Sequence, residues 1–274
     1  MKTLKIAVNG AAGRMGRRVV AAVARDPSTA LTAAWVASKE DVLGRDAGTL
    51  ADVGPLGVPC TDRPGEIRDV EVVIDFSTPD GFDAAADYCG QNGVPLVVAT
   101  TGLGGERLAR IDRLAKEIPV ILAPNTSVAV NVAMALTKKA AAALKTAVGE
   151  VDVEIVERHH RLKEDAPSGT ALKFGEIVAG EMGQTEHVHG REGRVGPRSG
   201  AEIGYHALRV GGHVGEHTVV FGIPGDGGSG GEEVEVAVRS FSRDSYAIGA
   251  VAAAKFLADK PPGRYAMAEV LGLD

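Results

Sequence analysis

Short apolar runs and helical patterns alternate along the first half of the chain. The run from Leu4 to Val8 predicts a buried strand that stops at Asn9-Gly10. From Arg14 the apolar residues recur at helical spacing until Asp26-Pro27 ends the pattern. Further strands are expected at 31–37, 70–76, 94–99 and 119–123, and further helices at 79–89 and 106–116. Strands that alternate with helices in this way indicate a parallel sheet with right-handed crossovers.

The pattern changes after a long helix expected at 128–147. Strands are then expected at 151–158, 201–210, 216–221 and 233–241, with one helix, at 169–181, among them. This arrangement is typical of an open mixed sheet, and therefore of a second domain. The glycine-rich stretch 225–231 predicts a flexible hairpin loop. An Ala-rich helix at 245–257 and the short tail are expected to pack back on the first domain.

Composition supports a folded globular protein, and its length allows one large or two modest domains. Of the 274 residues, 45% are hydrophobic and 24% are charged, which is ordinary for globular proteins. From the pattern of strands and helices we predict an α/β protein. Residues 1–127 plus 243–274 are expected to form a Rossmann-type domain with a parallel sheet, and residues 128–242 a second, α+β domain built on an open mixed sheet.

Charge and cysteine content argue against several classes of protein. The formal net charge of -6 disfavours general nucleic-acid binding, which normally needs a basic face. Cys60 and Cys89 form neither a disulfide framework nor a metal-binding pattern, so both are expected to be structural. No apolar stretch matches a signal peptide or a bilayer span. We expect a cytoplasmic protein with no nucleic-acid and no membrane partner.

Three glycines follow the first expected strand and open the first expected helix. Gly10, Gly13 and Gly16 have the spacing Gly-x-x-Gly-x-x-Gly, instead of the commoner Gly-x-Gly-x-x-Gly. At this place a dinucleotide pyrophosphate can meet the N–H groups of a helix N-terminus. Arg14 adds a cation beside the expected phosphates. The alternative interpretations are a plain strand–helix turn and a solvated arginine at a helix start.

The position that often selects NAD carries no acidic residue. An Asp or Glu about 20 residues after the glycines usually binds the adenine-ribose hydroxyls of NAD. Here Val36 or Ala37 occupies that position. Ser38 and Lys39 could accept a 2′-phosphate, although Lys39 is equally well explained as a loop surface residue. The pattern leaves both NADH and NADPH open.

The segment 157–171 holds the most informative cluster of polar residues. It leaves a strand, crosses a polar loop and enters a helix at Ser168-Gly169-Thr170, where small residues leave N–H groups for a carboxylate. His159, His160 and Lys163 supply charge and exchangeable protons. Such a cluster suits a small dianion that must be protonated; the alternative is an ordinary helix cap beside a solvated basic loop. No metal is expected, because adjacent histidines diverge on a strand.

Together these motifs resemble the dihydrodipicolinate reductase family, also called 4-hydroxy-tetrahydrodipicolinate reductase, of bacterial diaminopimelate and lysine biosynthesis. The resemblance covers essentially the whole chain, and the string from His159 to Thr170 is its most specific part. The other matching motifs are Gly10 to Gly16, Ile74 to Ser77, Ala99 to Gly102, Ala123 to Ser127, Arg191 to Gly193, Ile203-Gly204 and Gly215 to Thr218. The resemblance implies an oxidoreductase that transfers hydride from NADH or NADPH to the dehydrated form of 4-hydroxy-tetrahydrodipicolinate, giving tetrahydrodipicolinate.

The resemblance also implies roles for individual residues. His159 and Lys163 are the implied proton-transfer residues. The implied ligands of the substrate carboxylates are His160, Ser168, Gly169 and Thr170. The implied cofactor contacts are Gly10, Ala11, Ala12, Gly13, Arg14, Met15, Ala99, Thr100, Thr101, Ala123, Pro124, Asn125 and Thr126. The family further implies a small dicarboxylate substrate, a domain closure that excludes water, and a homotetramer assembled through the second-domain sheet.

Two departures and two alternatives accompany this prediction. The missing acid at Val36 or Ala37 puts the use of both cofactors in question, and the stretch 224–231 looks longer than the family's turn. His187, His189, His206 and His213 are expected to be surface or structural residues, and no role follows for His217. A dehydrogenase acting on aspartate or homoserine would leave the His159 to Thr170 string unexplained. A non-catalytic NAD(P) sensor would tolerate loss of Lys163.

Overall fold

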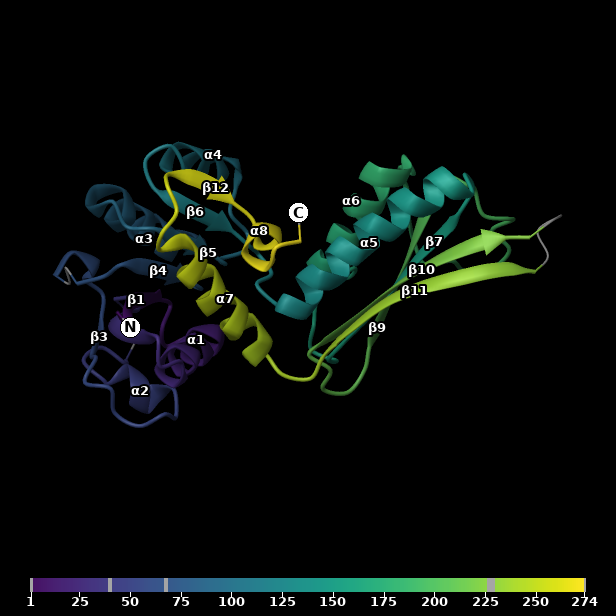
Figure 1. Ribbon diagram of the computed structural model, residues 1–274. Helices are drawn as coiled ribbons and strands as arrows, with labels where there is room; N and C mark the ends of the chain where they lie inside the picture. The colour runs from purple at the N-terminus through teal and green to yellow at the C-terminus, as the bar shows by residue number, and fades with distance from the viewer. Residues whose placement is uncertain (1, 39–40, 67–68, 226–229, 274) are drawn as a thin grey trace. The chain divides into compact units, whose positions relative to one another are not determined.

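The computed structural model describes residues 2–38, 41–66, 69–225 and 230–273. The chain forms two compact units (Figure 1). The first consists of Met1–Val128 together with Arg243–Asp274, so the C-terminal segment belongs to the same unit as the N-terminal one. The second consists of Ala129–Ser242.

The first unit is built on a seven-stranded sheet whose paired strands all run parallel, in the order β12-β6-β5-β4-β1-β2-β3. Its strands are β1 (Leu4–Asn9), β2 (Thr29–Trp35), β3 (Cys60–Thr61), β4 (Val72–Asp75), β5 (Leu96–Val98), β6 (Pro119–Leu122) and β12 (Gly263–Tyr265). The inner strands are buried on both faces, which explains why they are continuous apolar runs in the sequence.

Helices cover both faces of this sheet. Ile6 and Val8 of β1 pack in one apolar cluster with α1 (Arg14–Arg25) and α7 (Asp244–Leu257). Ala7, between them, faces the opposite cluster, which includes residues of α3 (Pro79–Asn92) and α4 (Gly105–Leu114). The unit also contains the short helices α2 (Ala47–Leu50), η1 (Pro64–Glu66) and α8 (Met267–Leu271). The result is a three-layer α/β/α arrangement of the Rossmann type.

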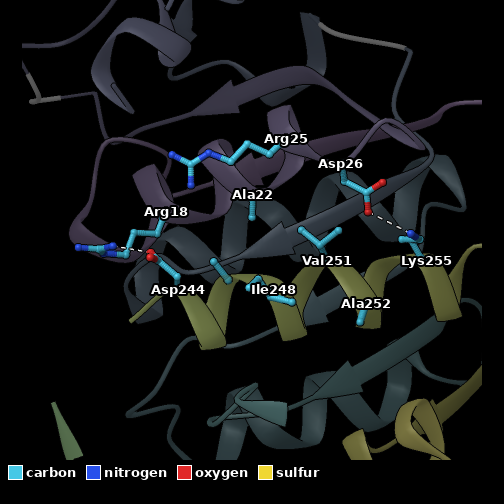
Figure 2. A pocket seen from close by; sticks show the side chains of 10 residues that line it. Arg18, Ala22, Arg25, Asp26, Asp244, Ile248, Val251, Ala252 and Lys255 are labelled. Atoms are coloured by element: carbon cyan, nitrogen blue, oxygen red, sulfur yellow. Dashed lines mark hydrogen bonds and ion pairs between the residues drawn. The ribbon is translucent and has the colours of Figure 1, made fainter. Parts of the chain in front are cut away.

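A groove of about 520 Å³ lies between α1 and α7 of the first unit (Figure 2). Ala22, Ile248 and Val251 are among its apolar lining residues, and ion pairs join the two helices. Arg18 pairs with Asp244, and Lys255 Nζ lies 3.0 Å from Asp26 Oδ2. The groove-lining residues include none of the candidate cofactor or substrate residues.

The second unit is built on a five-stranded mixed sheet in the order β11-β10-β7-β9-β8. Its strands are β7 (Asp152–His159), β8 (Glu186–His189), β9 (Glu202–Arg209), β10 (Gly215–Pro224) and β11 (Gly231–Ser240). β10 runs antiparallel to both β7 and β11, whereas β9 runs parallel to β7 and β8.

Two helices, α5 (Val128–Ala147) and α6 (Gly169–Met182), pack on this sheet (Figure 1). Their apolar residues share one cluster with inward-facing residues of β7, β9 and β10, including the fully buried Phe174 and Phe221. Along β7 the burial alternates, so that Val153, Ile155 and two polar residues at 157 and 159 are buried. The alternation places Glu157 and His159 on the covered face of the sheet.

The α/β class and the mixed sheet of the second unit confirm the predicted fold class. The expected long helix at 128–147 is present with those bounds. The strand expected at 31–37 begins two residues earlier, at Thr29, and ends at Trp35. The sequence pattern missed β3, β8, β12, α2 and α8, which are too short to show a period of their own.

Several smaller expectations concern single features. Pro224 pairs with Gly231, so the stretch 225–231 connects two antiparallel strands, although residues 226–229 lie outside the described residues. Cys60 and Cys89 are both buried and not in a disulfide. Among the helices of the described chain, none combines the length and the apolar character needed to cross a membrane.

Candidate active site

Four neighbouring strands of the first unit end on one edge of the sheet. Their registers pair Asn9 with Asp75, Asp75 with Val98, and Val98 with Leu122. The segments that follow β1, β5 and β6 are the three expected cofactor segments, and they therefore leave the sheet at the same edge. The strand order reverses between β1 and β4, and dinucleotides bind outside the carboxyl ends of parallel strands at such a point.

The glycine loop follows β1 at this edge and requires glycine at two positions. Gly10 has a φ of +76°, and a Cβ there would lie 2.5 Å from the carbonyl oxygen of Phe76. A Cβ on Gly16 would lie 1.9 Å from the carbonyl oxygen of Gly10. Gly13 is the N-cap of α1 and makes no side-chain cap bond, and Arg14 is exposed. The loop is therefore tight and presents backbone instead of side chains, as a phosphate-binding turn does.

A buried carboxylate, Asp75, joins the ends of three strands beneath the loop. It accepts hydrogen bonds from Asn9 Nδ2 at 2.8 Å, from Thr100 Oγ1 at 2.8 Å, and from the Ser77 hydroxyl. Burial raises the pKa of Asp75, and these hydrogen bonds oppose the rise. Thr100, an expected cofactor residue, thus turns its hydroxyl towards the protein. The sequence pattern assigned no role to Asp75, although it lies in one of the matching motifs.

Most other side chains of the cofactor segments also face the protein. Ala11, Ala12, Ala99 and Ala123 are buried, Met15 is half-buried, and Thr101 and Pro124 are exposed. Asn125 Oδ1 accepts from the Ser127 N–H at 2.9 Å. Thr126 Oγ1 donates to the Tyr246 carbonyl oxygen at 2.7 Å, which ties the third segment to α7. Most side chains of these segments therefore pack within the unit or form hydrogen bonds to it.

The end of β2 lacks a carboxylate in the part that the structure describes. Val36 is buried, and its N–H donates to the Thr61 carbonyl oxygen at 3.0 Å. Ala37 and Ser38 are exposed. Lys39 and Glu40 lie outside the described residues. Within residues 36–38, therefore, no acid is placed to bind ribose hydroxyls or to repel a 2′-phosphate.

In the second unit, the loop after β7 brings Ser168 to Glu157, which also contacts His159, so that both ends of the string from His159 to Thr170 meet on this side chain. Glu157 is 1% exposed, and its Oε1 accepts from the Ser168 N–H at 3.1 Å. Its Oε2 is hydrogen-bonded to His159 Nδ1. The two Nη atoms of Arg209 donate to the two carboxylate oxygens, at 2.9 and 2.8 Å. Burial acts to raise the pKa of Glu157, but the hydrogen bonds from Arg209 and His159, together with their charges, lower it below its ordinary value.

The hydroxyl of Ser168 links this carboxylate to a second buried histidine. Ser168 is the N-cap of α6, and its Oγ accepts from the Ala171 N–H at 3.2 Å. The same Oγ lies 3.0 Å from His217 Nε2. Burial lowers the pKa of His217 to about 4, and His159 and Lys163 add to this effect. A neutral His217 can accept a hydrogen bond from the Ser168 hydroxyl, so that the polar atoms of Ser168 itself all have partners.

His217 gives a pH dependence of stability. Its pKa in the folded protein is about 4, below the ordinary 6.5. The contribution of His217 to the free energy of unfolding is therefore complete above pH 6.5 and is lost as the pH falls towards 4. We expect the wild type to lose about 2 kcal/mol more unfolding free energy between pH 7.5 and 4.5 than His217→Gln. Urea unfolding followed by circular dichroism measures both. His189→Gln, at an exposed position, should behave as wild type; equal losses in all three proteins would contradict the prediction.

The remaining residues of the segment lie in the loop itself. The His160 N–H donates to the His213 carbonyl oxygen at 2.8 Å. His160 Nδ1 is buried and has no hydrogen-bond partner among the described residues. Lys163 Nζ lies 2.8 Å from Asp165 Oδ1, and its side chain is partly exposed. The hydrogen bond from Lys163 lowers the pKa of Asp165.

The structure thus brings the sequence-predicted residues together within each unit. The cofactor candidates follow β1, β5 and β6, which end at one edge of the sheet of the first unit. His159 and Ser168 share one buried network in the second unit. Gly169 and Thr170 form the first turn of α6 beside that network. Sequence reasoning missed Glu157, Arg209 and the role of His217. The one available signal was the position of Glu157, an acidic residue two places before His159 on a strand.

The described residues contain no group of three or more His, Cys, Asp or Glu side chains arranged to hold a metal ion. The other histidines of the second unit are exposed or half-buried. His187 Nδ1 lies 2.7 Å from the Tyr205 hydroxyl, and His206 Nε2 lies 2.7 Å from Glu154 Oε2. These contacts explain His187 and His206 as structural residues, without a role in the cluster around Glu157.

Comparisons with known proteins agree over the whole chain. Residues 4–126 match the family model for the dihydrodipicolinate reductase N-terminus, and residues 129–271 match that for the C-terminus. The 4-hydroxy-tetrahydrodipicolinate reductase of Rhodopirellula baltica is 49% identical, covering 98% of this chain and 96% of the relative. That of Alkalilimnicola ehrlichii is 43% identical, covering 99% and 100%. The dipicolinate-bound dihydrodipicolinate reductase of Paenisporosarcina sp. TG-14 superposes with a TM-score of 0.73 at 25% identity, covering 97% and 98%.

Proposed function

The chain belongs to the dihydrodipicolinate reductase family, and from that premise we propose how its residues carry out the reaction. It is an oxidoreductase that performs the 4-hydroxy-tetrahydrodipicolinate reduction step of diaminopimelate and lysine biosynthesis with a nicotinamide cofactor. The observation that carries the assignment of residues is the buried Glu157, on which His159 and the N-cap of α6 meet.

The first unit binds the nicotinamide dinucleotide, which supplies the hydride. The residues fit this group, because a Cβ on Gly10 would meet the backbone of Phe76, and a Cβ on Gly16 would meet the backbone of Gly10. The turn expected to hold the pyrophosphate therefore needs glycine at both positions. The proposed contacts are Gly10, Ala11, Ala12, Gly13, Arg14, Met15, Ala99, Thr100, Thr101, Ala123, Pro124, Asn125 and Thr126. Thr100 and Thr126 act through their backbone, because their hydroxyls bond to Asp75 and Tyr246.

The second unit binds the substrate carboxylates at the start of α6. Gly169 is the first residue of this helix, and the space where its side chain would lie is open. N–H groups at a helix N-terminus favour an anion, so Gly169 and Thr170 are the proposed backbone ligands. The Ser168 N–H already donates to Glu157, so Ser168 contributes by holding the turn. The buried, unpartnered Nδ1 of His160 supports its place as a further ligand.

His159 and Lys163 transfer the proton that accompanies the hydride. Burial lowers the pKa of His159, while the bond to Glu157 opposes this effect, and histidine exchanges protons near neutral pH. Lys163 brings a cation from the loop, where it pairs with Asp165 at the surface. The Lys163 ammonium neutralises a substrate carboxylate and completes the proton-transfer pair.

We further propose which domain binds the cofactor, which domain binds the substrate, and how the subunits assemble. Residues 1–127 plus 243–274 form the cofactor domain, and 128–242 the domain that binds substrate and joins subunits. The enzyme works in the cytoplasm as a homotetramer assembled through the five-stranded sheet, as the family implies. Sedimentation equilibrium tests the assembly: a mass of four chains is expected, and a monomer at working concentration would refute it.

Cofactor preference gives the direct test of function. Purified protein is mixed with enzymatically generated 4-hydroxy-tetrahydrodipicolinate, and oxidation of NADH and of NADPH is followed separately. Because no carboxylate at residues 36–38 opposes a 2′-phosphate, we expect kcat/KM with NADPH to equal or exceed that with NADH. A tenfold preference for NADH would refute this expectation. Absence of oxidation by a folded, cofactor-binding protein would favour the sensor alternative.

A further inference from the structure

Glu157 is a buried acid to which the assignments above give no part in the reaction itself. It is 1% exposed, on the covered face of β7, two residues before His159. Acidic side chains are almost never fully buried unless they are paired, because removing a charge from water is costly. A carboxylate at this depth, in contact with the proton-transfer histidine, therefore requires an explanation.

Arg209 holds the Glu157 side chain as a charged, oriented carboxylate. The guanidinium, on the neighbouring strand β9, donates to both carboxylate oxygens, a two-point geometry that is strong and directional. Arg209 is itself anchored, because its Nη2 donates to the Asp165 carbonyl oxygen at 2.6 Å and its Nη1 to the Leu208 carbonyl oxygen at 2.8 Å. The carboxylate plane is thus set by β9 independently of His159.

An ionised carboxylate only accepts hydrogen bonds, so the contact with Glu157 requires His159 Nδ1 to carry a proton. Nε2 is then the ring nitrogen that exchanges its proton with a substrate. Nε2 makes no hydrogen bond to any described residue, and a Cβ on Gly215 would lie 3.0 Å from it. The ring is therefore held by its Nδ1 side and is free to react at the other.

We propose that Glu157 is a positioning residue that holds His159 as the Nδ1–H tautomer and couples it to the substrate-binding end of α6 through the Ser168 N–H. When the His159 imidazolium donates its Nε2 proton, the neutral Nδ1–H imidazole remains on Glu157, and Glu157 itself takes no proton. The other carboxylate oxygen holds the N-cap of the helix that receives the substrate carboxylate. One side chain thus sets the distance between the proton donor and the anion site. This inference rests on the proposed roles of His159 and α6.

Glu157→Gln tests the proposal, because it keeps the shape of the side chain and removes the charge. We expect kcat to fall roughly tenfold to hundredfold, with a smaller change in the KM for the cofactor. The charged and titratable groups facing His159 are Glu157 on its own strand, Arg209 on β9, Lys163 in the loop and His217 on β10. Since Glu157 raises the pKa of His159, its loss should move the His159 limb of the kcat/KM profile to lower pH by about one unit.

The tautomer is measured directly, without any substrate. Imidazole 15N chemical shifts of the folded protein should show His159 protonated at Nδ1 in wild type and a mixture of tautomers in Glu157→Gln. Glu154→Gln is the matched control, because the same substitution lies on the same strand at a position facing the other way. It should keep wild-type kcat, pH profile and His159 tautomer.

Each outcome is decisive once thermal melts confirm that the variants fold. An unchanged pH profile and tautomer in Glu157→Gln, or an equal loss of kcat in Glu154→Gln, would overturn the proposal and leave Glu157 a structural residue. If Glu157→Gln does not fold, Arg209→Lys serves instead and should shift the same two readouts. A fully active His159→Gln variant would refute the proposed role of His159 in proton transfer. If the His159 tautomer still depended on Glu157 in that case, the inference that Glu157 orients the His159 ring would be kept.

Discussion

Lys163→Ala should lower kcat by about 10²- to 10⁴-fold, the range for loss of a positioned proton donor. Lys163 also supplies a cation for the substrate, so the KM for substrate should rise as well. Its ammonium pairs with the exposed Asp165, and its side chain is partly exposed, so its loss removes no core contact. The free energy of unfolding and the affinity for cofactor should therefore stay within about 0.5 kcal/mol of wild type.

Two further variants separate charge from proton transfer. Lys163→Arg keeps a cation that does not deprotonate, so it should restore much of the substrate KM but little of kcat. Lys173→Ala removes a lysine of α6 that pairs with Glu176 at the surface, and should change neither constant. Steady-state kinetics with denaturation curves measure all three. Near-normal turnover of Lys163→Ala would show that Lys163 has been assigned the wrong role.

Gly16→Ala should disrupt the glycine loop that is proposed to bind the cofactor. It should destabilise the first unit by about 3 kcal/mol, the upper end of the typical cost of overpacking a site. Its Cβ would lie 1.9 Å from the Gly10 carbonyl oxygen, and both groups belong to the backbone, so no side chain can rotate to relieve the clash. The loop must open, which displaces the N–H groups proposed to face the pyrophosphate. Cofactor affinity should fall at least tenfold.

Gly105→Ala is the control in the same unit. Gly105 is the first residue of α4, and a Cβ there would meet nothing within 4 Å. Alanine is a better helix former than glycine, so this variant should be neutral or slightly stabilised. Fluorescence titration with NADH or NADPH and urea unfolding measure both proteins. Equal cofactor affinity in Gly16→Ala and wild type would mean that this loop does not hold the dinucleotide.

The sequence alone determined the features whose information is local. Continuous apolar runs predicted the inner strands of the first unit. A strand that is buried on both faces is apolar at every position, so the run is visible in the sequence of that strand alone. The glycine loop and the string from His159 to Thr170 were equally visible, since each is a run of neighbouring residues with fixed spacing. These motifs were enough to predict the fold class, the family and the residues now proposed to act.

Only the tertiary structure decided which side chains surround those residues. Glu157, Ser168, Arg209 and His217 are spread over about 60 positions, and they meet because β7 lies between β9 and β10. Asp75 likewise receives hydrogen bonds from Asn9 and Thr100, which reach it through parallel registers. The short strands β3, β8 and β12 depend on a neighbouring strand in the same way. A hydrogen bond across a sheet is set by strand order and register, which arise from packing of the whole unit and leave no periodic trace in the chain.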